Sequence, residues 1–197
     1  MATQRKDARL LLVALGANVS VNNVSVNEES LEQTLARAIK AMAESGFAIR
    51  AISRFFRTPC FPEGAGPDYV NAAIAVRSAF SPSQVLERLH TIEAQFGRER
   101  VQRWGQRTLD LDLIGMEDVV LPDVTQFHQW RSLDPALQAK TAPDRLILPH
   151  PRLQDRAFVL VPLVDIARHW RHPVLGETLD QLLARLPKQD IAQVTPL

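Results

Sequence analysis

The chain has 197 residues, of which 46% are hydrophobic and 23% are charged, a composition that supports one buried core and excludes disordered, collagen-like and coiled-coil proteins. Twenty-three Lys and Arg residues against 22 Asp and Glu residues leave a formal net charge of +1, so no overall field draws the protein to nucleic acid or to an anionic membrane. The single cysteine, Cys60, excludes an internal disulfide and favours a cytoplasmic location, and no apolar run is long enough to span a bilayer.

The first part of the chain predicts strands and an amphipathic helix. Residues 9–15 form a short apolar run that predicts a buried strand. Residues 28–45 carry apolar side chains at helical spacing and predict a helix that ends at Gly46. Residues 47–58 and 69–78 are rich in β-branched and aromatic residues, so each predicts a further strand.

A second helix has the clearest start in the sequence. Ser81-Pro82-Ser83-Gln84 combines an N-cap serine, a proline at the first helical position and a glutamine that closes a capping box. Gly97 is placed to end this helix. Residues 108–114 then alternate strictly between apolar and polar side chains, which predicts a strand.

The remaining third of the chain is less regular. Residues 123–144 are polar, contain several prolines and show no stable period, so we interpret them as an inserted surface loop. Residues 158–167 are apolar but interrupted by Pro162, which leaves helix and strand open. Residues 179–186 predict a last helix. The element order predicts one α+β domain over residues 1–197, with helices packed against a central antiparallel sheet.

Two aspartates on the strand at 108–114 are the most informative residues. Alternation places the leucines on one face of the strand and Asp110 and Asp112 on the other. Aspartate is depleted in strands, and two carboxylates this close repel unless a cation lies between them. The pair therefore indicates a Mg²⁺ site, and the alternative is a solvated outer face of the sheet.

The segment that precedes this strand is rich in arginine. Residues 97–107 carry four arginines against one glutamate, with glycines near both ends. Arginine forks bind phosphate oxygens bidentately, so this segment predicts a lid over a nucleotide. The alternatives are a basic surface turn and a nucleic-acid patch in which Trp104 stacks on a base.

Other residues fit a small-molecule site but allow simpler readings. Tyr69 and Asn71 share one face of their strand and could hold a flat heterocycle, or be a core tyrosine and an edge amide. His150 lies between two prolines and close to arginines, which favours a positioned phosphate ligand over a core histidine. Glu93 lies at the border of an apolar helix stripe, where a flanking surface charge is the simpler reading.

Motifs along almost the whole chain resemble the 2-amino-4-hydroxy-6-hydroxymethyldihydropteridine pyrophosphokinase family. The resemblance rests on Ala14-Leu15-Gly16-Ala17-Asn18, Arg57-Thr58-Pro59, residues 67–73, Ile92-Glu93, Gly97-Arg98, residues 103–112, residues 148–151, residues 156–160 and Pro162-Leu163. It implies a ferredoxin-like α/β/α layered fold with a central antiparallel sheet. It also implies a cytoplasmic enzyme, monomeric, that transfers pyrophosphate from ATP to the 6-hydroxymethyl group of a reduced pterin in folate biosynthesis.

The resemblance also implies roles for individual residues. Asp110 and Asp112 would hold two Mg²⁺ ions, and Arg98 and Arg107 would meet the phosphates, so these four residues form the expected catalytic set. The expected pterin-binding residues are Thr58, Pro59, Phe61, Tyr69, Asn71, Trp104 and Phe158, with Tyr69 and Phe158 on the two sides of the ring. The expected ATP-binding residues are His90, Glu93, Arg100, Arg145, His150 and Arg156.

The chain departs from the family pattern at several positions. Gln106 stands where the family has proline, His90 where it has glutamine, the lid is short, and residues 123–144 form a longer stretch than is usual. Two other functions stay open at this point: a Mg²⁺-dependent phosphohydrolase and a non-enzymatic ferredoxin-like module that binds nucleic acid. A requirement for both Mg²⁺ and ATP would exclude the module, and AMP as the product would exclude ordinary phosphoryl transfer.

Overall fold

The structure is a computed structural model that describes residues 8–19, 30–60, 66–97, 107–134, 137 and 141–197. Its strands are β1 (Arg9–Ala17), β2 (Ala48–Ile52), β3 (Phe56–Thr58), β4 (Tyr69–Ser78), β5 (Asp110–Met116) and β6 (Thr195–Pro196). Its helices are α1 (Leu31–Glu44), α2 (Pro82–Gln95), α3 (Val124–Arg131), η1 (Leu153–Asp155, a 3₁₀ helix), α5 (Ala157–Ala167), α6 (Leu179–Leu183) and α7 (Lys188–Ala192).

The strands form one antiparallel sheet in the order β5-β1-β4-β3-β6, and β2 pairs with β4 next to β3. Two strand-helix-strand units supply this sheet, since α1 follows β1 and α2 connects β4 to β5. This is the ferredoxin-like order, so the predicted layered α+β fold is confirmed. β1 lies in the middle of the sheet and β5 at one end of it.

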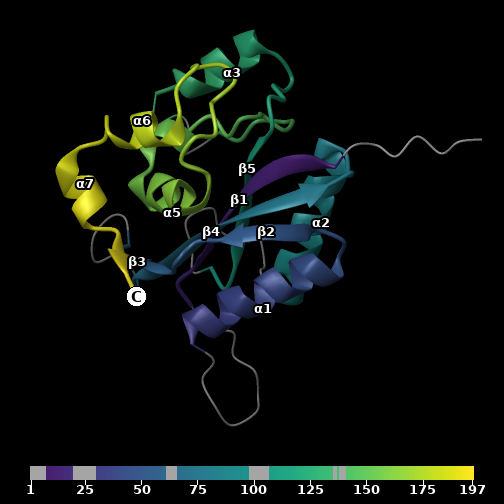
Figure 1. Cartoon of the computed structure of the whole chain (residues 1–197), viewed down its shortest axis with the longest axis vertical. Coiled ribbons are helices and arrows are strands. Elements are labelled where there is room, and N and C mark those ends of the chain that lie inside the picture. Colours follow the sequence, from purple (N-terminus) through teal and green to yellow (C-terminus); the bar gives the residue numbers. More distant parts are fainter. Residues whose placement is uncertain (1–7, 20–29, 61–65, 98–106, 135–136, 138–140) are drawn as a thin grey trace, which may run out of the picture.

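Helices cover both faces of the sheet, as Figure 1 shows, with α1 and α2 on one side and α5 and α6 on the other. The alternation of side chains along β1 explains this arrangement. Leu11, Val13 and Leu15 belong to the cluster that includes the buried faces of α1 and α2. Leu12 points the other way and packs with apolar residues of α5 and α6.

Both predicted N-terminal helices are confirmed, and each begins with a complete capping box. Ser81 accepts a hydrogen bond from the backbone N–H of Gln84, and the Gln84 side chain accepts one from the N–H of Ser81. Ser30 and Gln33 do the same at α1. These reciprocal bonds satisfy backbone donors that a helix otherwise leaves unpaired, which fixes the first residue of each helix.

The prediction of one strand over residues 47–58 is wrong, because the segment forms two strands separated by residues 53–55. Ser53 causes the break. The backbone N–H of Ser53 donates to the carbonyl of Ala73 at 2.9 Å, and Oγ of Ser53 accepts from the backbone N–H of Ala73 at 2.9 Å. Its hydroxyl also donates to the carbonyl of Arg54, so the side chain replaces one rung of the ladder.

The interpretation of residues 123–144 as a surface loop is wrong for α3. Asp123 caps this helix by accepting from the N–H of Gln126 at 2.8 Å. Phe127 is the one buried residue of α3, and its ring centroid lies 5.2 Å from the ring centroid of His172. A helix held by a single aromatic anchor has no apolar stripe, which explains why periodicity did not indicate it.

The C-terminal part resolves one open question and adds two elements. Residues 157–167 are helical, with Pro162 inside the helix and buried. The last predicted helix ends at Leu183, earlier than expected, and α7 and β6 follow it. β6 pairs with β3, so the end of the chain forms the edge of the sheet opposite to β5. Among the described helices, none combines the length and the apolarity needed to cross a bilayer.

Candidate active site

Strand register brings the polar residues predicted for the site into rows across the sheet. Asp110 on β5 pairs with Gly16 on β1, and Gly16 pairs with Asn71 on β4. In the next row, Asp112 pairs with Ala14, which packs against the cluster of α5 and α6. The two aspartates therefore lie on the α5 side of the sheet, opposite the buried leucines of β5, as alternation predicts.

The amide of Asn71 is held in one orientation. Asn71 is 6% exposed, and its Nδ2 donates to Oγ1 of Thr58 at 2.7 Å. Thr58 pairs in turn with Tyr69 across β3 and β4. A Cβ atom added to Gly16 would lie 3.0 Å from Oδ1 of Asn71, so the glycine lets the Asn71 amide approach the backbone of β1 closely. The predicted pairing of an aromatic ring with an amide on one strand face is confirmed.

Arg107 lies against the first aspartate and is fixed by Asn18. Its guanidinium forms an ion pair with Asp110. The backbone N–H of Arg107 donates to Oδ1 of Asn18 at 2.8 Å, and its carbonyl accepts from the N–H of Asn18 at 3.0 Å. Sequence reasoning gave Asn18 no role of its own, although it closes the Ala14–Asn18 motif.

His150 lies beside the second aspartate in an arrangement that keeps its ring neutral. Burial, with the charge of Arg156 next in size, lowers the pKa of His150 to about 4, and Asp112 opposes this shift. Nδ1 of His150 accepts from the backbone N–H of Arg152 at 3.1 Å. The proton of a neutral ring is therefore on Nε2, which makes this atom a hydrogen-bond donor.

Arg156 and Phe158 flank the start of α5. Burial lowers the pKa of Arg156, and Asp112 opposes this effect, so the guanidinium lies within electrostatic range of the Asp112 carboxylate. The guanidinium carbon lies 5.7 Å from the centre of the Phe158 ring. Phe158 is 41% exposed, which is high for a large apolar side chain, so part of its ring is open to a ligand. α5 packs on β4, the strand that carries Tyr69 and Asn71.

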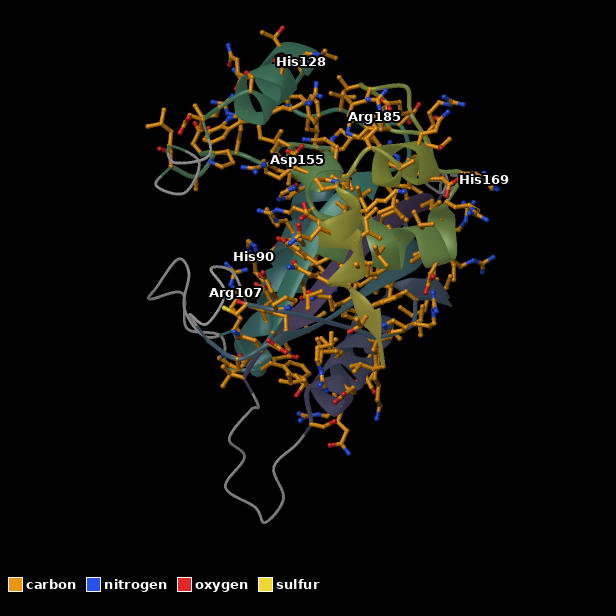
Figure 2. The ribbon with its side chains drawn as sticks, turned by 90° about the vertical axis from the view of Figure 1, so that its left-hand side faces the viewer. His90, Arg107, His128, Asp155, His169 and Arg185 are labelled. Carbon is orange, nitrogen blue, oxygen red and sulfur yellow. The ribbon has the colours of Figure 1, made fainter. Side chains whose placement is uncertain are left out.

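Two residues of α2 belong to the predicted ATP set. Glu93 is 2% exposed, and its Oε1 accepts from the backbone N–H of Leu111 at 2.7 Å. The surface-charge alternative for Glu93 is therefore wrong. His90 is half-buried and lies on the same side of the molecule as Arg107, as Figure 2 shows. Contact of either side chain with ATP stays a prediction.

Other predicted site residues are not brought together by the described contacts. Phe61, Arg98, Arg100 and Trp104 lie outside the described residues, as does Gln106. Arg145 is exposed and pairs with its neighbour Asp144 at 3.2 Å. Pro59 is half-buried next to Thr58.

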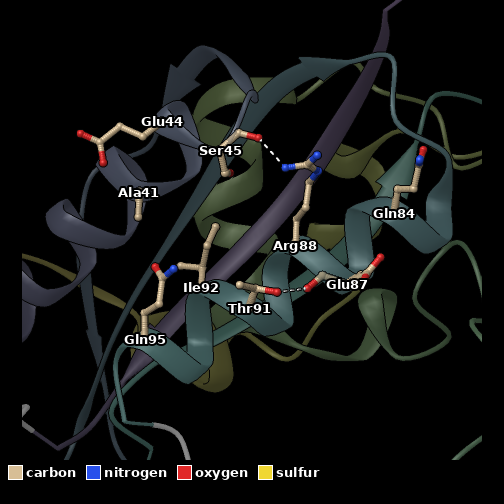
Figure 3. Close-up of a pocket in the computed structure, with 9 residues that line it drawn as sticks. All are labelled: Ala41, Glu44, Ser45, Gln84, Glu87, Arg88, Thr91, Ile92 and Gln95. Carbon is tan, nitrogen blue, oxygen red and sulfur yellow. Dashed lines mark hydrogen bonds between the residues drawn. The ribbon is translucent and has the colours of Figure 1, made fainter.

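A groove of about 500 Å³ lies elsewhere, between α1 and α2 (Figure 3). Polar side chains of both helices line it, and Arg88 donates to the carbonyl of Ser45 across it at 3.0 Å. Its lining includes none of the predicted site residues. The candidate site therefore lies on the rows of the sheet and not in this groove.

The donor set fits a hard divalent cation that shares its coordination with a ligand. Asp110 and Asp112 supply carboxylate oxygens on one strand face. Among the described residues, no group of three or more His, Cys, Asp or Glu side chains is placed to hold a metal ion. Mg²⁺ binds through one or two carboxylates, with phosphate oxygens and water completing its shell, so the pair suits this ion together with a phosphate ligand.

Solved structures resemble this fold. Plasmodium falciparum HPPK-DHPS, crystallised as the A437G variant with SDX-DHP, superposes over 93% of this chain with a TM-score of 0.63 and 14% sequence identity. The wild-type protein gives a TM-score of 0.60 at 13% identity. This chain covers 46% and 45% of those two chains. At this identity the likeness shows the fold alone.

Curated relatives share more sequence and carry the name 2-amino-4-hydroxy-6-hydroxymethyldihydropteridine pyrophosphokinase. The Synechocystis protein is 37% identical over 77% of this chain and 67% of its own length. The Methylorubrum extorquens protein is 34% identical over 81% of this chain and 88% of its own length. The Pseudomonas aeruginosa protein is 31% identical over 92% and 94%.

The match to a defined family covers most of the chain. Residues 12–168 match the family described as 7,8-dihydro-6-hydroxymethylpterin-pyrophosphokinase (HPPK). That range includes β1 from Leu12 onward, both aspartates, His150 and α5, so all the rows described above lie within it. Neither the phosphohydrolase nor the nucleic-acid module is supported by these matches. The chain belongs to the 7,8-dihydro-6-hydroxymethylpterin-pyrophosphokinase family.

Proposed function

We propose that this chain transfers the pyrophosphoryl group of ATP to the 6-hydroxymethyl oxygen of 6-hydroxymethyl-7,8-dihydropterin in folate biosynthesis. A bond forms between that oxygen and the β-phosphorus, the bond from the β-phosphorus to the α-phosphate oxygen breaks, and AMP leaves while the hydroxyl proton is released. The observation that carries this proposal is the row Asp110-Gly16-Asn71, which sets a metal-binding carboxylate beside an amide able to read a heterocycle.

Asp110 and Asp112 hold Mg²⁺ in this proposal, and two ions are expected. When bound, Mg²⁺ supplies positive charge that offsets the charge of the phosphate oxygens. The protein contributes fixed positions for the two carboxylates, because both side chains project from one strand of a paired sheet. The chemistry then depends mainly on positioning and charge, with no covalent intermediate on the protein.

A basic cluster beside the aspartates binds the phosphates. Arg107 and Arg156 supply guanidinium groups, and the neutral ring of His150 donates through Nε2. Because the pKa of His150 is about 4, this donor does not change its charge between pH 6 and pH 8. The same role is proposed for Arg98, Arg100 and Arg145, and contact with the nucleotide for His90.

The pterin lies over the β4 side of the row. Asn71, oriented by Thr58, reads the polar edge of the ring, and backbone groups near Pro59 and Phe61 complete the pocket. Tyr69 and Phe158 stack on the two faces of the ring, and Trp104 closes over it. The open ring of Phe158 supports this role, because a core residue would be buried.

The proposed enzyme is a cytoplasmic monomer that needs no nucleic acid. Light scattering after gel filtration tests this. A mass near 22.1 kDa agrees with the proposal, and an obligate dimer contradicts it.

Product analysis tests the reaction. With ATP, Mg²⁺ and the reduced pterin, we expect AMP and the pterin diphosphate in equal amounts, separated by ion-exchange chromatography. ADP with a pterin monophosphate would indicate ordinary phosphoryl transfer, and free phosphate without any pterin product would indicate a phosphohydrolase. Either result would overturn the proposal.

A further inference from the structure

We propose that Glu93 is a positioning residue for the metal site, which acts through the backbone of β5. Its carboxylate fixes the peptide N–H of Leu111, the residue between Asp110 and Asp112. This inference rests on the proposed function, because it assigns the two aspartates to metal binding.

The position of β5 explains why it needs a side-chain partner. β5 is the end strand of the sheet, and the described strands pair with it on one side only, through β1. An end strand has backbone donors with no strand to receive them. On this edge the N–H of Leu111 donates to Glu93 at 2.7 Å, and the carbonyl of Ile114 accepts from the N–H of His150 at 2.8 Å.

The burial of Glu93 indicates that its carboxylate has a specific role in the fold. Glu93 is 2% exposed on the face of α2 that also buries Val85, Leu89 and Ile92. An apolar side chain at this position would avoid the cost of removing a carboxylate from water. A hydrogen bond from a backbone N–H to an ionised acceptor is strong enough to offset part of this cost and to hold the strand in place.

The peptide N–H that Glu93 binds belongs to the residue between the two aspartates, so its position affects the direction of both aspartate side chains. Asp110 precedes Leu111 in the chain and Asp112 follows it. A rotation of the two peptide planes at Leu111 would therefore move both carboxylates. Leu111 itself is 2% exposed and packs in the same core as Ile92. Glu93 thus links the rigid helix α2 to the spacing of the two carboxylates.

Three variants separate positioning from stability. Glu93→Leu has similar volume but no acceptor, and Glu93→Gln keeps an acceptor oxygen. Glu117→Ala is the matched control, because Oε1 of Glu117 accepts from the backbone N–H of Leu10 at 3.0 Å, beyond the opposite end of β5. Thermal melts of all three report stability, and Glu93→Ala replaces Glu93→Leu if that variant does not fold.

The readout is Mn²⁺ binding in the presence of a non-hydrolysable ATP analogue, measured by electron paramagnetic resonance, together with the Mg²⁺ concentration that gives half-maximal turnover. We expect Glu93→Leu to weaken Mn²⁺ binding and raise the Mg²⁺ requirement by roughly 10- to 100-fold, as supporting residues around metal ligands do. Glu93→Gln should recover most of this loss, and Glu117→Ala should match the parent. The KM for pterin should change little, since Asn71 and Tyr69 lie on β4.

Parent-like Mn²⁺ binding by folded Glu93→Leu would overturn the inference. So would a Glu93→Gln variant as defective as Glu93→Leu, because the acceptor would then not be what matters. Failure of the proposed function is distinguishable, since the parent protein itself would then produce no AMP. Mn²⁺ binding is measured without turnover, so it tests Glu93 in either case.

Discussion

Gly16 occupies the space between the residue proposed to read the pterin and the residue proposed to bind metal. A side chain there would press on the Asn71 amide, because a Cβ would lie 3.0 Å from Oδ1 of Asn71 and 3.9 Å from Cδ1 of Tyr69. That distance requires Asn71 to move by a few tenths of an ångström, which would disturb its 2.7 Å bond to Thr58.

We therefore expect Gly16→Ala to weaken pterin binding by about tenfold, which corresponds to about 1.4 kcal/mol. The affinity for an ATP analogue should stay within twofold, because the added Cβ approaches Asn71 and Tyr69 and none of the residues proposed to bind phosphate. Calorimetric titration with each ligand separately makes the comparison. An equal loss for both ligands would mean that the substitution distorts the sheet and does not act on the pterin site alone.

At the same scale, the direction of Asp110 and Asp112 was predictable because strand alternation depends only on neighbouring residues. The roles of Asn18 and Glu93 were not. Asn18 fixes Arg107, and Glu93 fixes Leu111, through backbone groups far away in the chain. Contacts with backbone atoms distant in the chain leave no local pattern of side-chain types in the sequence, so only the folded arrangement reveals them.

Helix α5 lies on the side of the sheet that carries the two aspartates. Its first turn carries Phe158, while Val159, Leu160 and Leu163 are buried against the sheet. The ring of Phe158 stands out of this buried face with 41% of its surface exposed. Truncating it should therefore remove a ligand contact without opening a core cavity.

Phe158→Ala should weaken pterin binding by roughly 0.5 to 1.5 kcal/mol beyond the loss of buried area, and should leave ATP binding nearly unchanged. Phe80→Ala is a matched control, since Phe80 also has an arginine over its ring, with the Arg88 guanidinium carbon 3.9 Å from the centroid. The control should lose stability but keep pterin affinity. If Phe158→Ala behaves like the control, Phe158 is a structural residue.

Among the helices and strands, sequence patterns predicted the elements that bury a continuous apolar stripe. α1 and α2 were predictable because capping boxes and apolar spacing agree. α3 was not, because Phe127 alone anchors it, and the division of residues 47–58 depends on hydrogen bonds between Ser53 and Ala73 on another strand. Because of Pro162, the sequence did not decide between helix and strand for α5. The structure shows a helix with Pro162 buried inside it.

A buried histidine, His172, lies where α3 packs against the C-terminal part of the chain. His172 is fully buried between the rings of Phe127 and Trp170, and its Nδ1 accepts from the N–H groups of Val174 and Leu175 at 3.2 Å. Burial, with the charge of Arg131 next in size, lowers its pKa to about 4. The folded protein thus keeps this ring neutral at a pH where the unfolded chain binds a proton.

This lowered pKa predicts how stability depends on pH. Between pH 6.5 and about 4 the unfolded state binds one more proton at His172, so the free energy of unfolding should fall as pH falls, with no further loss from this group below about pH 4. His172→Asn keeps an acceptor but cannot titrate. It should reduce the slope in this window by about 1 kcal/mol per pH unit, measured by urea unfolding. An unchanged slope would contradict the assignment.

In the proposed reaction, the β- and γ-phosphates leave ATP together. The most direct measurement follows the label of [β-³²P]ATP in a reaction with Mg²⁺ and 6-hydroxymethyl-7,8-dihydropterin, with the Asp112→Ala variant as the control. We predict that the label moves entirely to the pterin product in the parent, and that it remains in ATP in the variant. Label recovered in ADP, or transfer undiminished in Asp112→Ala, would contradict the account.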